Sequence, residues 1–391
     1  MALLSTVRSL VAVASDAARN ELANRIAPAR REVPAPPASA ARLIAENDAA
    51  PLKGHIDYTA YAKSMGIPAK SGPSGKELLP VTGPLTYTWD YHSERPELRA
   101  LYEKSKDLNW NARTDLPWET SIDPESEITP DAMSPLYGTK MWRTLERDGK
   151  LGEMRRNFTA YMLSNFMHGE QGALLATAQL VDVAPTMDAK MYAAAQVFDE
   201  ARHLEAYDRY LREKIELVYP VSPHLKQLLD TLLQDSRPDF KFLGMQIMVE
   251  GVALAAFGLI QQLSTETLIK QITQMIMQDE SRHVAFGVLS LKDTYRQMAP
   301  NELRDREDFI IESSKLLRDR FLAQEVWERM GLPQQACQEA VEASEAMAIF
   351  RRLLFSKIVP NTKRLGLLTP YVRKGFEELG VIEFEHLPAT A

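Results

Sequence analysis

Cysteine is almost absent from this sequence. Among 391 residues only Cys337 is a cysteine, so the chain cannot form an internal disulfide. A single thiolate also cannot hold an iron–sulfur cluster, which needs several cysteine ligands. Because a chain without disulfides suits a reducing compartment, we expect a cytoplasmic protein.

Three other features are missing. No uninterrupted apolar run approaches about 18 residues, so no transmembrane segment is indicated. No glycine-rich dinucleotide fingerprint of the GxGxxG type occurs. Basic residues are not in excess either, because the net charge is −7 and the pI is about 5.7, which argues against binding to nucleic acid.

Proline is unevenly distributed and marks the organisation of the chain. Of the 23 prolines, 14 lie in the first 135 residues, and most others separate long stretches with an apolar repeat of about 3.6 residues, as helix ends should. The predicted helices are 137–150, 153–182, 187–217, 223–236, 239–263, 266–297, 302–330 and 334–358. The sequence therefore predicts an all-α fold, a helical bundle with additional helices.

The expected organisation has four parts. Residues 1–50 form an N-terminal arm and linker, 51–135 an irregular cover segment, 136–360 the bundle and 361–391 a C-terminal extension. An apolar stripe in the first 26 residues faintly resembles a transit peptide or a membrane-surface helix, but a docking arm or frayed terminus is favoured. Trp89, Trp110 and Trp118 of the cover segment are expected to be packing anchors.

The most informative feature is a repeated pentapeptide. DEARH occupies 199–203, and DESRH occupies 279–283, 80 residues later. Each pentapeptide has a lone glutamate 30 residues before its own glutamate, at Glu170 and Glu250. A Glu and a His three residues apart lie on one face of a helix, so each pentapeptide aims a carboxylate and an imidazole at one point. The spacing predicts a pseudo-repeat of two helical hairpins.

The two repeats together predict a site for two metal ions. Four carboxylates and two imidazoles form a ligand set that suits paired iron or manganese. The surroundings are apolar, since residues 244–258 contain no charge except Glu250, and a buried carboxylate needs a cation or a proton. The predicted ligands are Glu170, Glu200, His203, Glu250, Glu280 and His283.

Each ligand glutamate of the pentapeptides follows an aspartate. We expect Asp199 and Asp279 to form a second shell, each accepting the free ring N–H of a histidine from the other hairpin and so fixing its tautomer. The alternative is that both aspartates extend an acidic surface. Arg202 and Arg282 balance this negative charge inside the bundle or lie on its surface, and the sequence leaves both possibilities open.

This constellation resembles the ferritin-like di-iron carboxylate superfamily, in particular its ribonucleotide-reductase small-subunit-like and bacterial multicomponent monooxygenase branch. The resemblance is firm over residues 150–300 and vague elsewhere. It implies a ferritin-like four-helix bundle that binds two iron ions, with Fe/Mn or Mn as alternatives, and uses O2 as co-substrate. The resemblance assigns Glu170, Glu200 and His203 to one metal and Glu250, Glu280 and His283 to the other, with one or two bridging carboxylates.

Two positions differ from particular branches of the superfamily, and a third position matches a branch. Multicomponent hydroxylases commonly carry a threonine where this chain has Leu254. Arylamine N-oxygenases carry an extra histidine where this chain has Ile276, which disfavours that chemistry. Tyr207 has the spacing of the radical-forming tyrosine of ribonucleotide reductase small subunits, and it is redox-active, a hydrogen-bond donor near the metal, or a core tyrosine.

The resemblance implies an O2-dependent oxygenase or hydroxylase that acts on a small, largely apolar organic substrate. The alternatives are a radical-generating subunit that uses Tyr207, a soluble acyl desaturase and a ferroxidase. The expected partners are the substrate, an external reductase or ferredoxin as electron donor, and a second copy in a homodimer. The expected substrate pocket, for which core packing is the alternative reading, contains Phe166, Ala173, Thr177, Leu254 and Phe257.

Overall fold

The structure of the chain is a computed structural model that describes residues 79–81 and 83–390. The secondary structure of these residues is helical and contains no strand, so the predicted all-α fold class is confirmed. The predicted N-terminal arm, 1–50, and the cover segment before residue 79 lie outside the described residues. All described residues belong to one compact unit, Ile56–Ala391.

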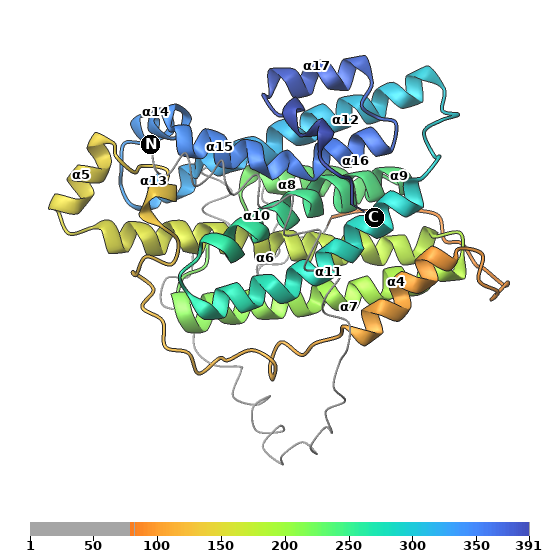
Figure 1. Ribbon diagram of the computed structural model, residues 1–391, viewed down its shortest axis with the longest axis horizontal. Helices are drawn as coiled ribbons and strands as arrows, with labels where there is room; N and C mark the ends of the chain where they lie inside the picture. The colour runs from red at the N-terminus through yellow and green to blue at the C-terminus, as the bar shows by residue number, and fades with distance from the viewer. Residues whose placement is uncertain (1–78, 82, 391) are drawn as a thin grey trace, which may run out of the picture. The chain divides into compact units, whose positions relative to one another are not determined.

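Two antiparallel helical hairpins form a four-helix bundle (Figure 1). The first hairpin is α6 (Leu151–Val183) with α7 (Met187–Tyr210), and the second is η3 (Phe242–Val249) and α10 (Glu250–Leu263) with α11 (Thr267–Leu291). The connection between the hairpins runs through α8 (Pro223–Gln234), which corresponds to the predicted helix 223–236. The second, third, fifth and sixth predicted helices are therefore the bundle helices.

Side-chain caps fix where the second helix of each hairpin begins. Thr186 accepts a hydrogen bond from the backbone N–H of Ala189 at the start of α7. Glu266 accepts hydrogen bonds from the backbone N–H groups of Leu268 and Ile269 at the start of α11. Both helices then run for the same distance before they reach their pentapeptides, which keeps the two repeats in register.

The helix predicted at 239–263 is not a regular α-helix. It begins as the short α9 (Pro238–Lys241), continues as the π-helix η3 and becomes α-helical at Glu250. Hydrophobic periodicity does not distinguish a π-turn from an α-turn, and π-turns occur frequently at functional sites. Among the described residues, Pro238–Leu263 is the one stretch apolar and long enough to span a membrane, but 72% of its apolar window is buried inside the protein.

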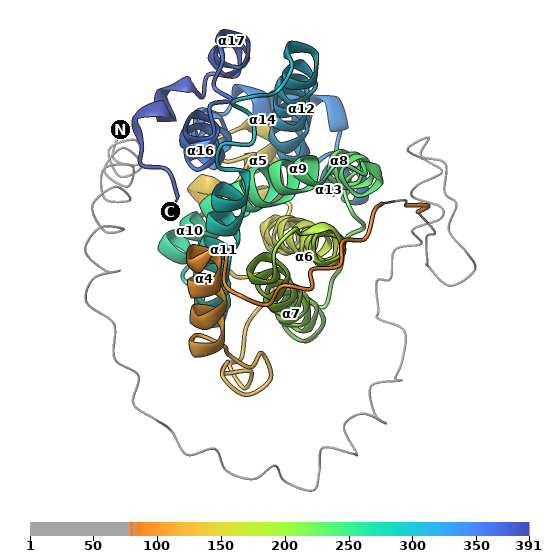
Figure 2. The same ribbon diagram turned by 90° about the vertical axis from the view of Figure 1, so that its right-hand side faces the viewer.

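The described part of the cover segment contains a helix that the sequence analysis missed, α4 (Pro96–Asp107). It packs against α7 and α11 (Figure 2), and its start is marked by a proline in the first turn. Trp110 and Trp118 are buried, as predicted for packing anchors. The prediction was wrong for Trp89, which is 75% exposed.

A second layer of helices covers the α10 side of the bundle (Figure 2). Its main elements are α12 (Pro300–Asp319), α13 (Gln324–Arg329), α14 (Gln334–Ala343), α15 (Glu345–Leu353), α16 (Ile358–Arg364) and α17 (Pro370–Glu378). The predicted helix 302–330 is interrupted at Ala323, whose positive φ of 52° breaks the helical path. The short helix α5 (Lys140–Arg147) precedes α6 and packs against it.

Candidate metal centre

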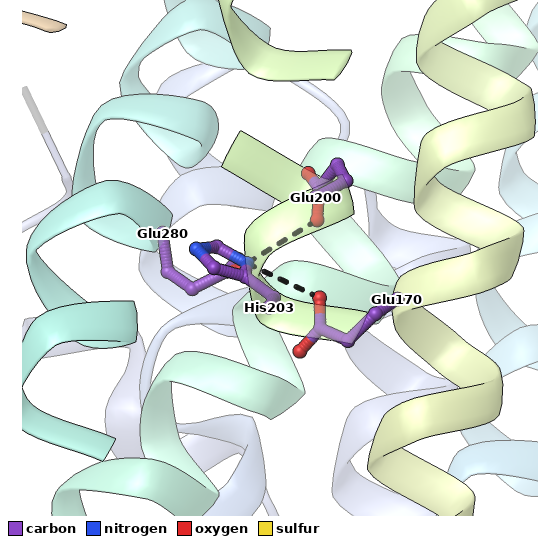
Figure 3. A group of neighbouring side chains, drawn as sticks. All are labelled: Glu170, Glu200, His203 and Glu280. Atoms are coloured by element: carbon purple, nitrogen blue, oxygen red, sulfur yellow. Dashed lines mark hydrogen bonds and ion pairs between the residues drawn. The ribbon is translucent and has the colours of Figure 1, made fainter. Parts of the chain in front are cut away.

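Six side chains from the four bundle helices meet in the interior. They are Glu170 on α6, Glu200 and His203 on α7, Glu250 at the start of α10, and Glu280 and His283 on α11. Each is at least 95% buried. Their possible ligand atoms form two groups, each spanning no more than 4.8 Å: Glu170, Glu200, His203 and Glu280 in one, and Glu200, Glu250 and His283 in the other. Figure 3 shows the first group, with the three carboxylates arranged around the imidazole.

Both imidazoles point Nδ1 at the carboxylates. His203 Nδ1 lies 3.3 Å from Glu170 Oε2 and 3.2 Å from Glu280 Oε1. His283 Nδ1 lies 3.1 Å from Glu200 Oε1. In each ring Nδ1 is therefore the atom available to a metal, and Nε2 is left for other contacts.

The cluster has more acceptor atoms than the protein satisfies. One carboxylate oxygen of Glu200, one of Glu250 and one of Glu280 is buried without a hydrogen-bond partner among the described residues. Unpaired buried carboxylates are unfavourable, whereas two divalent cations would balance the charge of the four glutamates. The donor set and these orphaned oxygens fit a pair of hard or borderline metal ions.

The electrostatics of the metal-free cluster show the same excess of negative charge. Burial raises the pKa of Glu170 and of Glu250 well above the ordinary carboxyl value, and the neighbouring carboxylates raise the pKa of Glu250 further. Burial also opposes ionisation of Glu200, but His283 and His203 hold its pKa below the ordinary value. Burial and the neighbouring negative charges thus favour the protonated form of Glu170 and Glu250.

Two aspartates and two arginines connect the hairpins behind the histidines. His203 Nε2 lies 3.0 Å from Asp279 Oδ2, and His283 Nε2 lies 3.2 Å from Asp199 Oδ2. These contacts cross between hairpins, in the arrangement expected from the sequence. Arg202 and Arg282 are buried and each donates to both aspartates, so these arginines lie inside the bundle and not on its surface.

Two further side chains contact this network and were missed as site residues. Trp110 donates its indole N–H to Asp279 Oδ2 over 2.7 Å. Gln196 donates from Nε2 to Glu200 Oε1 over 3.0 Å and to Glu250 Oε1 over 2.8 Å. Gln196 lies one helical turn before Glu200, so its position on the ligand face could have been noticed. The contact of Trp110 comes from outside the repeat, and the sequence contains no indication of it.

The predicted pocket residues and Tyr207 lie on both sides of the carboxylates. Phe166, Tyr207 and Phe257 contact one another, with ring centroids 4.9 to 6.1 Å apart. Leu254 lies one turn after Glu250, toward the same side. Ala173 and Thr177 follow Glu170 along α6 and so lie toward the opposite side. Tyr207 is fully buried and its hydroxyl has no hydrogen-bond partner among the described residues, while burial raises its pKa well above the ordinary value.

The chain resembles known proteins in sequence and in structure. The sequence profile of the family described as P-aminobenzoate N-oxygenase AurF matches residues 92–366. An R2-like ligand-binding oxidase with an aerobically reconstituted metal cofactor is similar in structure, with a TM-score of 0.45, 16% identity and coverage of 69% of this chain and 93% of that chain. The dimanganese(II)-NrdF of Streptococcus sanguinis has a TM-score of 0.47 and 12% identity, covering 74% of this chain and 98% of that chain. No curated protein matches the sequence.

Proposed function

The chain belongs to the family of P-aminobenzoate N-oxygenase AurF, and we propose that it is an O2-dependent di-iron oxygenase that acts on a small, largely apolar organic substrate. The superfamily expected from the sequence, that of the ferritin-like di-iron carboxylate proteins, is thereby confirmed. The sequence analysis disfavoured arylamine N-oxygenation because Ile276 stands where those enzymes carry an extra histidine. The family match includes this position, so an isoleucine there does not exclude membership.

The observation that carries the proposal is the buried cluster of four glutamates and two histidines. We propose that Glu170 and His203 hold one iron and Glu250 and His283 the other. Glu200 has ligand atoms in both groups, which supports a bridging role. Glu280 Oε1 lies 3.2 Å from His203 Nδ1 and 3.7 Å from His283 Nδ1, which supports the same role for Glu280.

When bound, two iron ions supply the redox chemistry that O2 reduction requires. The protein residues have three separate tasks. The aspartate behind each histidine orients the ring and leaves Nδ1 deprotonated toward the metal. Gln196 orients Glu200 and Glu250 by donating to one oxygen of each. The apolar side chains around the cluster exclude bulk water, which strengthens every charge interaction inside.

An external protein supplies the electrons in this proposal. Cys337 is buried, and burial raises the pKa of its thiol to about 11, so it is an unreactive core residue. The sequence contains no dinucleotide fingerprint and too few cysteines for a cluster. We therefore propose a separate reductase or ferredoxin as donor, and a cytoplasmic location in which such donors operate.

Two reactions are compatible with the family. The family name supports oxygenation of an arylamine nitrogen, and the apolar surroundings of the carboxylate cluster support hydroxylation of a hydrocarbon. A radical-generating subunit is the second candidate function, because the phenol of Tyr207 is buried beside the cluster without a hydrogen-bond partner. The oxygenase is preferred because the family to which the chain belongs is described as an oxygenase.

We also propose a homodimer, for which a row of exposed apolar side chains provides the support. Leu85, Tyr87, Trp89 and Tyr91 are 61% to 75% exposed and occupy alternate positions of a non-helical segment. Hydrogen bonds from the intervening Thr86 and Thr88 attach the segment to the end of α6 and to the turn that follows it. Exposed apolar patches of this kind are typical of protein interfaces.

Oxygen uptake tests the proposed function. The iron-loaded protein with a ferredoxin, its reductase and NADH should consume O2 only when a substrate is added, and the product should gain one oxygen atom from 18O2. Aniline and toluene are suitable first compounds, since they separate nitrogen from carbon oxygenation in rings of similar size. Oxidation of NADH by the isolated chain would contradict the need for an external donor.

A further inference from the structure

The offset of 80 residues between the repeats pairs each residue near the cluster with a counterpart in the other hairpin. The pairing takes Glu170 to Glu250 and His203 to His283. The neighbours of the ligands pair as Phe166 with Gln246, Tyr207 with Gly287, Thr177 with Phe257, and Gln196 with Ile276. In each of these pairs one member is apolar or aromatic, and its counterpart is polar or a glycine. The two ends of the cluster therefore differ in chemistry.

One end, which we call the aromatic end, consists of Phe166, Tyr207, Phe257 and Ile276. The three rings form a closed group, with centroid distances of 4.9 Å between Phe166 and Phe257, 5.9 Å between Tyr207 and Phe257, and 6.1 Å between Phe166 and Tyr207. All four side chains are at least 95% buried. This end is therefore filled by the protein itself.

The other end, which we call the polar end, consists of Thr177, Tyr192, Gln196 and Gln246. Gln246 packs against Gly287 so closely that a Cβ atom at Gly287 would lie 2.5 Å from Gln246 Cβ. Gln196 reaches Glu250 with its amide N–H, and Tyr192 contacts Phe286, the residue before Gly287.

Thr177 lies at the same level of the bundle. The contact between Glu170 and His203 sets the antiparallel register of α6 and α7. Thr177 lies seven residues after Glu170 on α6, and Gln196 lies seven residues before His203 on α7. Thr177 and Gln196 are therefore at the same level along the bundle. The four polar residues therefore gather on one side of the carboxylates.

The polar end has hydrogen-bonding groups without partners. The hydroxyls of Thr177 and Tyr192, the amide oxygen of Gln196 and both amide atoms of Gln246 are buried and unpaired among the described residues. All four residues are fully buried, with 0% exposed. Folded proteins pair nearly all buried polar groups, because an unpaired one is unfavourable, so such a cluster indicates a missing partner.

The side chains that correspond to one another across the repeat also differ in size. At the aromatic end Tyr207 contributes a phenol ring, and its counterpart at the polar end, Gly287, contributes no side chain. The ring of Phe166 is likewise replaced by the slimmer side chain of Gln246. A ligand group bound at the polar end would meet the amide of Gln246 at the position that corresponds to the ring of Phe166 at the aromatic end.

The charges near the polar end select an uncharged group. Arg282 is engaged by Asp199 and Asp279. Lys241, five residues before Gln246, donates to Gln179 and to backbone carbonyls at the end of α8. The charge of Arg282 is therefore balanced by two carboxylates, although its Nε has no hydrogen-bond partner among the described residues, and the unpaired side-chain atoms of the polar end supply both donors and acceptors.

We infer, on the basis of the proposed function, that the polar end is the substrate subsite and that Gln246 selects an uncharged group able both to donate and to accept hydrogen bonds, such as a primary carboxamide. The amide of Gln246 pairs with such a group in two hydrogen bonds, one in each direction. Thr177, Tyr192 and the amide oxygen of Gln196 supply the remaining contacts. Gln246 is a specificity residue in this arrangement and takes no part in the redox step.

Equilibrium binding to the full-length, iron-loaded protein tests this inference without turnover. Benzamide and benzoate are the probes, because they have nearly the same shape and differ in charge and in donors. Calorimetric titration should show at least about tenfold tighter binding of benzamide. Gln246→Met should weaken benzamide about tenfold, and Thr177→Val should weaken it to a smaller extent. Gln262→Met, the same substitution at an exposed position of α10, is the control and should change nothing.

Thermal unfolding provides the second measurement. If the amide of Gln246 has no hydrogen-bond partner in the ligand-free protein, Gln246→Met removes an unpaired buried group. The ligand-free variant should then keep its Tm or gain a few degrees. A clear fall in Tm would show that internal contacts or ordered water already satisfy the amide, and it would overturn the inference. Equal binding of the two probes, or unchanged benzamide binding by Gln246→Met, would overturn it as well.

Metal analysis of the same samples separates this inference from the function on which it rests. Two irons per chain without selectivity for benzamide contradict only the subsite. Selective benzamide binding by a protein that holds no iron pair contradicts the proposed oxygenase and leaves the recognition by Gln246 standing.

Discussion

His203 Nε2 lies 3.0 Å from Asp279 Oδ2, although the two residues belong to different hairpins. The contact makes the orientation of each histidine depend on the opposite repeat. Burial opposes ionisation of Asp279, but His203 and Arg282 keep its pKa below the ordinary value, so it is a carboxylate in the folded protein. An ionised partner at Nε2 keeps the proton there and leaves Nδ1 for the metal.

Asp279→Asn should therefore weaken metal binding by about 10- to 100-fold, because the amide can no longer fix the ring as a charged acceptor. Competition with a chelator measures the loss. Asp308→Asn is a suitable control, since Asp308 is a half-buried carboxylate of α12 that accepts a hydrogen bond from Tyr371. Equal metal affinity of the Asp279 variant and the control would show that Asp279 has only a packing role.

Tyr207→Phe distinguishes the oxygenase from the radical-generating subunit. The phenol hydroxyl has no hydrogen-bond partner among the described residues, so its removal should leave the fold and the metals in place. For an oxygenase we expect turnover to fall by less than about tenfold. A stable tyrosyl EPR signal in the wild type, lost in the variant, would instead support the radical-generating function.

The proposed homodimer predicts protection of Trp89. The remaining tryptophans, Trp110, Trp118, Trp142 and Trp327, are at most 7% exposed, so acrylamide should quench mainly Trp89 in a monomer. Acrylamide quenching of Trp89 should decrease over the range of protein concentration in which sedimentation shows that the dimer forms. The double variant Tyr87→Ser with Tyr91→Ser should stay monomeric, unlike Tyr137→Ser, which alters an exposed tyrosine near α5. Free quenching of Trp89 in a wild-type dimer would locate the interface elsewhere.

Removal of the metals should make stability depend on pH. The pKa values of Glu170 and Glu250 are raised by burial, and their stabilising contribution is present below the ordinary value of 4.5 and lost as pH rises through the raised value. Burial disfavours charged His203 and His283, but the carboxylates raise their pKa values above 6.5, so their contribution is also lost with rising pH.

The metal-free protein should consequently have a lower Tm at about pH 8.5 than at about pH 6. In the iron-loaded protein the cations replace these protons, so its Tm should change less over the same range. Differential scanning calorimetry of both forms measures the difference. A metal-free protein that becomes more stable with rising pH would contradict the charge distribution described for the cluster.

The repeat allowed much of the site to be predicted before the structure. Helical spacing places Glu200 with His203, and Glu280 with His283, on one face, and the common offset brings both faces together. The π-helix before Glu250 could not be predicted, because its hydrophobic pattern also fits an α-helix. The contact of Trp110 with Asp279 joins residues 169 positions apart through a segment without periodicity, so no local rule indicates it.

The substrate pocket stays a prediction, and its five predicted residues do not lie on one side of the ligands. Phe166 and Phe257 were grouped with Thr177 because each lies one or two turns from a glutamate, but a turn before and a turn after the ligand lead to opposite ends of the bundle. The relation between the two ends depends on the antiparallel register of the helices. Comparison of Phe166 with Gln246 across the repeat would have indicated the difference from the sequence alone.

Metal content tests the central claim most directly. Protein produced with ample iron, or with iron and manganese, should contain two metal ions per chain by elemental analysis. Glu200→Ala and His283→Ala should each lose most of this metal, because each removes a buried ligand for which no neighbouring side chain substitutes. Two metals in the wild type and a large loss in both variants are the predicted result. A single zinc ion, or no metal, in the wild-type protein would contradict the account.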